Sequence, residues 1–236
     1  MTRGKRQHMI RNLEIAATAV VIIIVAIGSA FYFDKNAAKP VTPTSLTPLA
    51  VGDIFTFKLS GTTVLGSSDV VTPAEFMDYN NTEYYNVTVT AINGEQVSLE
   101  TDWQFKNSTI VAGPQVINLS NGATAELAEF SYLYPSNLTV NDRLYPQESG
   151  NLRVNSTDTE SFAHINRAVD FWQTEDQFAN TNDQTFGTMR YDYVGVHFDR
   201  QSGMMVSLTR IEFFTNPEIQ LTITWQLVSS NAWTVN

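Results

Sequence analysis

Alternation of apolar and polar side chains predicts β-strands throughout the second half and middle of the chain. From Glu83 to Phe105, apolar residues recur at every second position on both sides of Asn93-Gly94. This pattern is typical of a hairpin with a two-residue primed turn, in which both turn residues take positive φ. Two further runs, Asp53 to Leu59 and Leu221 to Leu227, alternate in the same way and predict strands with one buried face.

A second hairpin is predicted near the C-terminus. Its arms are Met189 to Asp199 and Met204 to Phe214, joined by a turn at residues 200–203. Within the second arm the apolar residues change face, from even-numbered positions up to 208 to odd-numbered positions from 211 onward. Because a strand that keeps its register cannot change face, we expect a bulge near Thr209 or Arg210, and hence a bent sheet.

The segments between these strands are less regular. Thr124 to Tyr134 places apolar residues at helical spacing and predicts a helix. Residues 160–173 fit either a helix, capped by Thr157 with Glu160, or a strand. The polar stretch Thr174 to Thr188 has no periodicity and is predicted to be a loop. The fold class expected is mainly β or α+β: a bent antiparallel sheet with hairpins and at most two helices.

The stretch YDYVGVHFDRQSGMMVSL, with its tyrosine-rich strand, Asp-x-x-x-Gly turn and apolar second strand, resembles the hairpins of exported β-clam domains, the class of bacterial lipoprotein carriers. The likeness covers about Met189 to Trp225 and implies a clam that holds an apolar ligand, with no catalytic residues to transfer. A lipoprotein also needs a cysteine, which this chain lacks. A basic leader at residues 1–12, an uncharged run from Ile15 to Phe33, a Pro/Thr-rich tether at 34–49 and the opening Val51-Gly52-Asp53 together resemble uncharacterised archaeal membrane-anchored surface proteins.

The N-terminal pattern predicts a membrane span. The nineteen residues from Ile15 to Phe33 carry no charge and follow a basic leader. At about 1.5 Å per residue, such a helix just crosses a hydrocarbon core of about 30 Å. The positive-inside bias keeps the leader cytoplasmic. We therefore expect four regions: a leader (1–12), a transmembrane helix in the lipid bilayer (13–33), a Pro/Thr-rich tether (34–49) and an extracytoplasmic β-rich domain (50–236).

A cleaved signal peptide is the alternative to a permanent anchor. Gly28-Ser29-Ala30 would supply small residues at a cleavage site. The apolar run is longer than a usual signal, however, and Phe31, Tyr32 and Phe33 suit an aromatic belt at the membrane interface. The anchor is therefore favoured, with the protein in the cell membrane as a single-pass surface protein.

Composition narrows the function of the outer domain. From Ala50 onward the chain has 8 Lys and Arg against 22 Asp and Glu, a net charge of 8 − 22 = −14. Such an acidic domain argues against nucleic acid as a partner. Without cysteine the domain has no disulfides and must be held together by burial alone, which its length permits.

Six Asn-x-Ser/Thr triplets follow the predicted span, where about 3.5 are expected by chance from the composition. On the outer side of a membrane these are candidate N-glycosylation sites. The six asparagines are Asn80, Asn86, Asn107, Asn118, Asn137 and Asn155.

The sequence contains no motif that assigns a catalytic residue, a metal ligand or a cofactor. His164 and His197 lack metal-type spacing, and no Gly-x-Ser-x-Gly occurs. Two carboxylate pairs, Glu100 with Asp102 and Asp170 with Glu175, could serve glycoside hydrolysis. Positions on a solvent-exposed polar face account for these carboxylates better. Oxygen ligands at 176–183 lack the glycine of an EF-hand loop. The four tryptophans, which suit a core better than a ligand platform, are Trp103, Trp172, Trp225 and Trp233.

Three functions remain open at this point. The first is a non-enzymatic domain on one membrane span, which binds an unknown surface partner or serves as envelope structure. The second is a carrier that holds an apolar ligand in a β-clam. The third is an enzyme acting on envelope glycans. A filled core favours the first, a wide apolar pocket the second, and a cleft with two facing carboxylates the third.

Overall fold

Nine strands form one antiparallel sheet in the computed structural model, which describes residues 49–74, 76–123, 131–147, 152–162, 165–178 and 188–233. The strand order is β4-β3-β2-β1-β9-β8-β7-β6-β5. The strands are β1 (Ile54–Leu65), β2 (Thr82–Asn93), β3 (Gln96–Phe105), β4 (Ile110–Asn118), β5 (Ser156–Phe162), β6 (Ile165–Gln177), β7 (Thr188–Asp199), β8 (Met205–Thr215) and β9 (Ile219–Ser230). Within these residues the one α-helix is α2 (Met77–Asn81). The prediction of a mainly β domain with an antiparallel sheet is confirmed.

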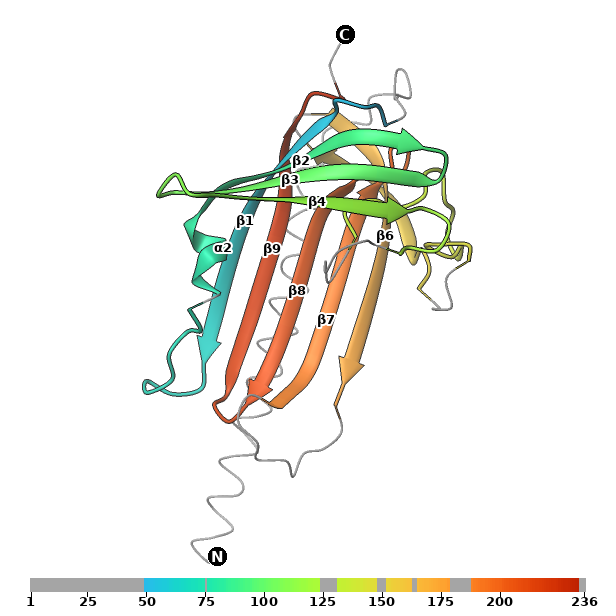
Figure 1. Cartoon of the computed structure of the whole chain (residues 1–236). Helices are drawn as coiled ribbons and strands as arrows, with labels where there is room; N and C mark the ends of the chain where they lie inside the picture. Colours follow the sequence, from blue (N-terminus) through green and yellow to red (C-terminus); the bar gives the residue numbers. More distant parts are fainter. Residues whose placement is uncertain are drawn as a thin grey trace, which may run out of the picture. The chain divides into compact units, whose positions relative to one another are not determined.

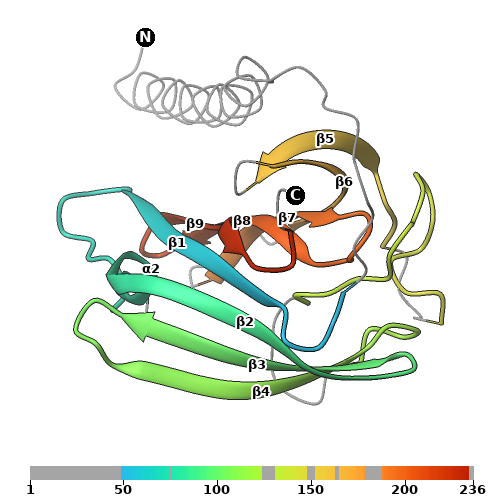
Figure 2. The same ribbon diagram turned by 90° about the horizontal axis from the view of Figure 1, so that it is seen from above.

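The sheet folds over at β1. β1 pairs with β9 along Phe55–Leu65, but with β2 only along Ile54–Phe57. β2 therefore leaves β1 after four residues, and β2, β3 and β4 cross over one face of the remaining strands as a second layer (Figures 1 and 2). We call strands β2–β4 the roof, and the face of β1, β9, β8, β7 and β6 that lies toward it the inner face.

Where β2 departs, α2 and one side-chain amide take its place along β1. Phe76 packs against Gly61, where an added Cβ would lie 2.8 Å from the ring. The Asn80 side chain accepts a hydrogen bond from the Gly61 N–H (3.0 Å) and donates one to the Gly61 C=O (2.7 Å). Asn80 thus satisfies the two backbone groups that a neighbouring strand would otherwise pair.

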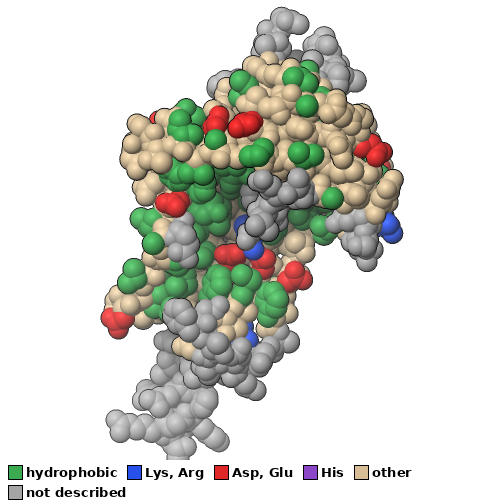
Figure 3. Space-filling model, in the orientation of Figure 1, with side chains coloured by type: hydrophobic (Ala, Val, Ile, Leu, Met, Phe, Trp, Pro, Cys, Tyr) green, Lys and Arg blue, Asp and Glu red, His purple; other side chains and the backbone are tan. Residues whose placement is uncertain are grey.

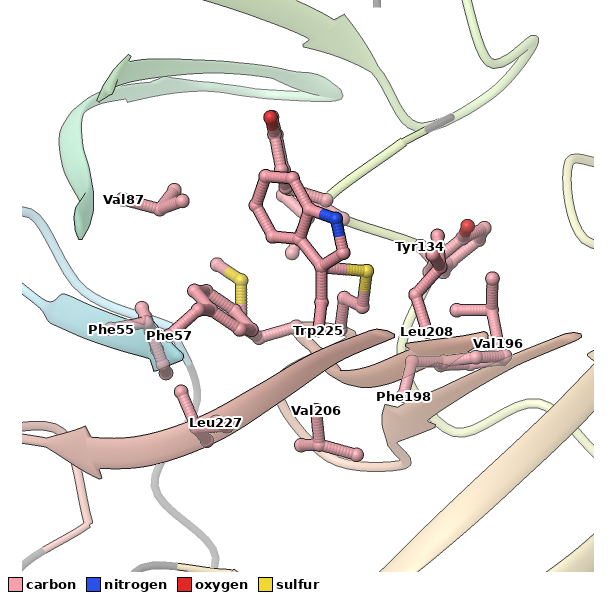
Figure 4. Packing of buried hydrophobic residues seen from close by; sticks show 14 of the residues in the cluster. Phe55, Phe57, Val87, Tyr134, Val196, Phe198, Val206, Leu208, Trp225 and Leu227 are labelled. Atoms are coloured by element: carbon pink, nitrogen blue, oxygen red, sulfur yellow. The ribbon is translucent and has the colours of Figure 1, made fainter. Parts of the chain in front are cut away.

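Much of the core lies between the roof and the inner face (Figure 4). Trp225 rises from β9 between Phe57 and Leu208, and its ring meets Tyr85 of the roof edge-on at 4.6 Å. Tyr132, from the segment after β4, adds a hydrogen bond of 2.7 Å between its hydroxyl and that of Tyr85. Burial raises the pKa of Tyr132 well above its ordinary value, and the neighbouring Tyr85 adds to the effect. The predicted inward faces of β1 and β9 are both in this core.

The first predicted hairpin is confirmed as β2 and β3, with a different pair of turn residues. Asn93 belongs to β2 and pairs with Gln96, so the two-residue loop is Gly94-Glu95. Gly94 takes positive φ (62°), whereas Asn93 does not. The prediction of positive φ at Asn93 is therefore wrong. The β2–β3 register also shifts between Val89 and Ala91, shortly before this turn.

The second predicted hairpin is confirmed as β7 and β8, but the bulge predicted at Thr209 or Arg210 is wrong. The β8–β9 register runs without interruption from Ser207 to Phe214. The shifts between β7 and β8 lie at Met189/Tyr191 and His197/Phe198 instead. The side chains of β8 therefore alternate between the two faces without interruption, and Arg210 and Glu212 occupy the inner-face positions that follow Leu208.

The other local predictions have mixed outcomes. Of residues 160–173, left open between helix and strand, 160–162 belong to β5 and 165–173 to β6, while 163 and 164 lie outside the described residues. The predicted loop at 174–188 is wrong at its start, because residues 174–177 complete β6; residues 179–187 lie outside the described residues. In the predicted helix 124–134, residues 124–130 also lie outside them, and the described end is extended, with Leu133 bridging to Met204.

The predicted leader and span, and the tether up to residue 48, likewise lie outside the described residues. In the part that is described, no helix is both long and apolar enough to cross a bilayer.

Candidate functional site

A group of charged side chains interrupts the apolar inner face below the roof (Figure 3). Arg210 of β8 binds both carboxylate oxygens of Asp192 on β7, at 3.2 and 3.3 Å. Its Nη2 also lies 2.9 Å from a carboxylate oxygen of Glu212. These three side chains are each at most one-fifth exposed. We call Asp192, Arg210 and Glu212 the inner polar cluster.

Strand register gives Arg210 and Glu212 apolar neighbours on β9, whereas Asp192 lies opposite Glu212 on β8 and Asp176 on β6. Arg210 lies opposite Ile223 on β9 and Val194 on β7, and Glu212 lies opposite Leu221. Ion pairs of this kind fix the phase of the sheet, because a slip of one residue would break them and turn the charges to the other face. The sequence pattern did give a signal, since Arg210 and Glu212 occupy the positions where the alternation of β8 reverses.

A second chain of polar groups occupies the opposite, outer face. His197 of β7 places its Nδ1 3.1 Å from the Ser207 hydroxyl on β8 and its Nε2 3.3 Å from a Glu160 carboxylate oxygen on β5. The Phe171 ring stacks on the imidazole at 4.5 Å between centroids. We call Glu160, His197 and Ser207 the outer polar chain.

The outer polar chain has the residue types of a nucleophilic triad, but its surroundings suit a structural role. Ser207 lies inside β8 and is paired on both sides, with His197 and with Gln226. Backbone N–H groups in a doubly paired strand are committed to the sheet, so they are not free to stabilise an oxyanion. Burial raises the pKa of Glu160 to about 7, with a smaller contribution from Asp158, and burial lowers the pKa of His197 to about 4. Both groups therefore tend toward their neutral forms.

The carboxylate pairs weighed for glycoside hydrolysis do not face one another across a cleft. Asp170 and Glu175 are separated by five positions in β6, whose register with β7 is unbroken, so they point to opposite faces. Asp170 is fully buried and accepts a hydrogen bond from Thr157, and burial raises its pKa. Glu100 and Asp102 lie two residues apart on β3, in register with the exposed β4 residues Pro114 and Ala112.

The other candidate residues are two histidines and four tryptophans. His164 is not among the residues whose side chains are described. In the part of the chain that is described, no three His, Asp or Glu side chains gather in a way that would hold a metal ion. Trp172, Trp225 and Trp233 are buried in the core, and Trp103 packs against it with its indole N–H donated to Thr82.

The six sequons differ in their surroundings. Asn107, Asn137 and Asn155 are exposed, in the β3–β4 turn, in the segment after β4 and just before β5. The side chains of Asn86 and Asn118 are partly buried and accept hydrogen bonds from hydroxyl groups. Asn80 is committed to the backbone of Gly61. Because a glycan on Nδ2 lies on the same side as Oδ1, it would displace the hydrogen that Asn80 donates to the Gly61 C=O.

A shallow pocket of about 660 Å³ opens at the β3–β4 turn, beside α2. Its lining mixes Phe105 and Val111 with Asp78, Lys106 and Asn107. The Lys106 ammonium is already bound to the Asn80 carbonyl at 2.7 Å. Comparison of the chain with protein-family models and with curated proteins finds no match.

Proposed function

We propose that this protein is a non-enzymatic surface domain, carried outside the cell membrane on one N-terminal span, which binds a partner or serves as envelope structure. The uncharged run 15–33 after a basic leader supports the anchored arrangement. The low charge content of 16% and the six sequons suit a domain on the outer side.

The observation that carries the non-enzymatic assignment is the filled core beneath the roof. Trp225 is only 5% exposed and contacts Phe57, Tyr85 and Tyr132. This is the place where a β-clam carrier would enclose an apolar ligand, and side chains of the protein occupy it. The inner polar cluster and the outer polar chain do not favour catalysis, because the side chains of each are paired with one another.

Two measurements test the proposal. Protease added to intact cells should degrade the region after Asp34 and leave a tag before Met9 protected, because the positive-inside bias fixes the orientation. Protection of the C-terminal domain would overturn the topology.

Native mass spectrometry of the purified full-length chain, in a detergent that leaves bound lipids in place, tests the filled core. We expect no lipid that stays bound to the domain after proteolytic release from the span. A lipid retained in a fixed ratio by the released domain would instead support the carrier, and hydrolysis of an envelope glycan would support the enzyme.

A further inference from the structure

The two edges of the sheet differ in charge. β5, at one edge, carries Asp158 and Glu160. β4, at the other, carries no charged residue along its nine positions, and the uncharged stretch extends from residue 107 to residue 125. Edge strands normally resist pairing with other chains through charged side chains, bulges or proline. β4 has only Pro114.

The first half of β4 is also apolar and exposed. Ile110 and Val111 are 55% and 54% exposed, and Ala112 is exposed as well. Further along, Gln115 and Ile117 are buried under the roof. The open part of the edge is therefore the end near the β3–β4 turn, at residues 110–112.

Proline shows which backbone groups point outward. Pro114 lies opposite Glu100 and has no N–H, so this pair is one whose backbone groups point away from each other. The hydrogen bond from the Phe105 N–H to the Thr109 C=O gives the same assignment. It shows that the backbone N–H and C=O groups of odd-numbered residues along β4 point toward β3. Ile110 and Ala112 consequently direct their N–H and C=O groups to the free edge.

We propose that the free edge of β4 pairs antiparallel with the same edge of a second copy of this chain, centred on Val111. In this twofold arrangement Ile110 of each copy lies opposite Ala112 of the other, and four N–H···O=C bonds form. Val111 lies opposite its own counterpart, and Pro114 falls beyond the paired residues. A symmetric contact of this kind needs only one self-complementary surface.

Charge favours a second copy at this edge over the edge at β5, which carries Asp158 and Glu160. Each domain carries a net charge of −14, so two copies repel one another wherever acidic side chains meet. On the neighbouring strand β3, Asp102 lies opposite Ala112. Across the joined sheet the two Asp102 residues would be separated by three strand spacings, about 14 Å, beyond the screening length of about 8 Å at physiological ionic strength.

Cysteine cross-linking tests this pairing sharply, because the chain has no cysteine of its own. In the proposed register the two Val111 residues form a non-hydrogen-bonded pair with Cα atoms about 4.5 Å apart, which suits a disulfide. Full-length Val111→Cys, produced in a host without N-glycosylation because of the nearby Asn107, should form a disulfide-linked dimer when its membranes are oxidised. Thr159→Cys, exposed on the charged edge strand β5, is the matched control and should stay monomeric.

A second substitution separates edge pairing from random collision. Ala112→Pro in the Val111→Cys background removes an outward N–H needed by the dimer but none of the bonds to β3. We expect the cross-link to fall at least tenfold while the thermal midpoint stays that of Val111→Cys. A monomeric Val111→Cys, equal cross-linking of Thr159→Cys, or an undiminished cross-link in the Ala112→Pro variant would each overturn the proposal. None of these results affects the protease test of topology.

Discussion

Replacing Trp225 with alanine tests the central packing of the domain. The indole is 95% buried and contacts three aromatic rings from β1, the roof and the segment after β4. Truncating a buried tryptophan costs about 3–5 kcal/mol, through lost transfer energy and the cavity left behind. For a domain of about 190 residues, each kcal/mol lowers the thermal midpoint by about 2–4 °C. We therefore expect a decrease of about 6–20 °C.

The assay is thermal and urea unfolding of the full-length chain in detergent, followed by circular dichroism so that loss of the fluorophore does not matter. Trp225→Phe keeps a ring against Tyr85 and should lose clearly less stability. Val228→Ala, three residues along the same strand and 43% exposed, is the control and should change the free energy of unfolding by less than about 0.5 kcal/mol. An unchanged midpoint in Trp225→Ala, with loss of a bound hydrophobic dye, would refute the core assignment and favour the carrier.

Three further substitutions test other parts of the structure. Gly203 has φ 74°, and an added Cβ would lie 1.8 Å from the Tyr134 carbonyl oxygen, so Gly203→Ala should unfold the domain. Gly94 has φ 62° but open space around it, so Gly94→Ala should lose only about 1 kcal/mol of unfolding free energy. Equal thermal midpoints of the two variants would contradict this. Asn80→Ala leaves the Gly61 backbone groups unpaired and should lower the free energy of unfolding by about 1–3 kcal/mol. The control Asn107→Ala, at an exposed site, should lower it by less than about 0.5 kcal/mol. Peptide mapping should find no glycan on Asn80. The folded pKa of His197 is lowered to about 4, so its contribution to stability is present above about pH 6.5 and lost as the pH falls toward 4. The folded pKa of Glu160 is raised to about 7, so its contribution to stability is present below about pH 4.5 and lost as the pH rises toward 7. In denaturant titrations, Glu160→Gln should therefore lose stability as the pH falls, and His197→Gln should lose stability as the pH rises. Slopes of the same sign would contradict these two pKa shifts.

Local alternation was enough to predict β1, both hairpins and β9, because each has one buried and one exposed face. It failed in β8, since alternation records only apolarity. Arg210 and Glu212 remain on the inner face because Arg210 forms ion pairs both with Glu212 and with Asp192 on the next strand. The contact of Glu160 with His197 joins β5 to β7 across β6, and no local pattern encodes it. α2 has no buried residue within its five positions, so it gave no periodic signal.

The short pairing of β1 with β2 has a mechanical consequence. In the proposed anchored arrangement, a pull between the membrane and a surface partner enters the domain through the residues just before β1. Force along β1 acts across its hydrogen bonds to β9 from Phe55 to Leu65, and strand bonds that run perpendicular to the pull are strained together rather than one after another. Asn231 binds both Ile54 and Gly52 at the point of entry, so peeling must first break this contact. The roof pairs with β1 over four strand residues, with two further backbone bonds between Val89 and residues 52 and 53, so the loaded strand is bonded to β9 over a longer stretch than to the roof.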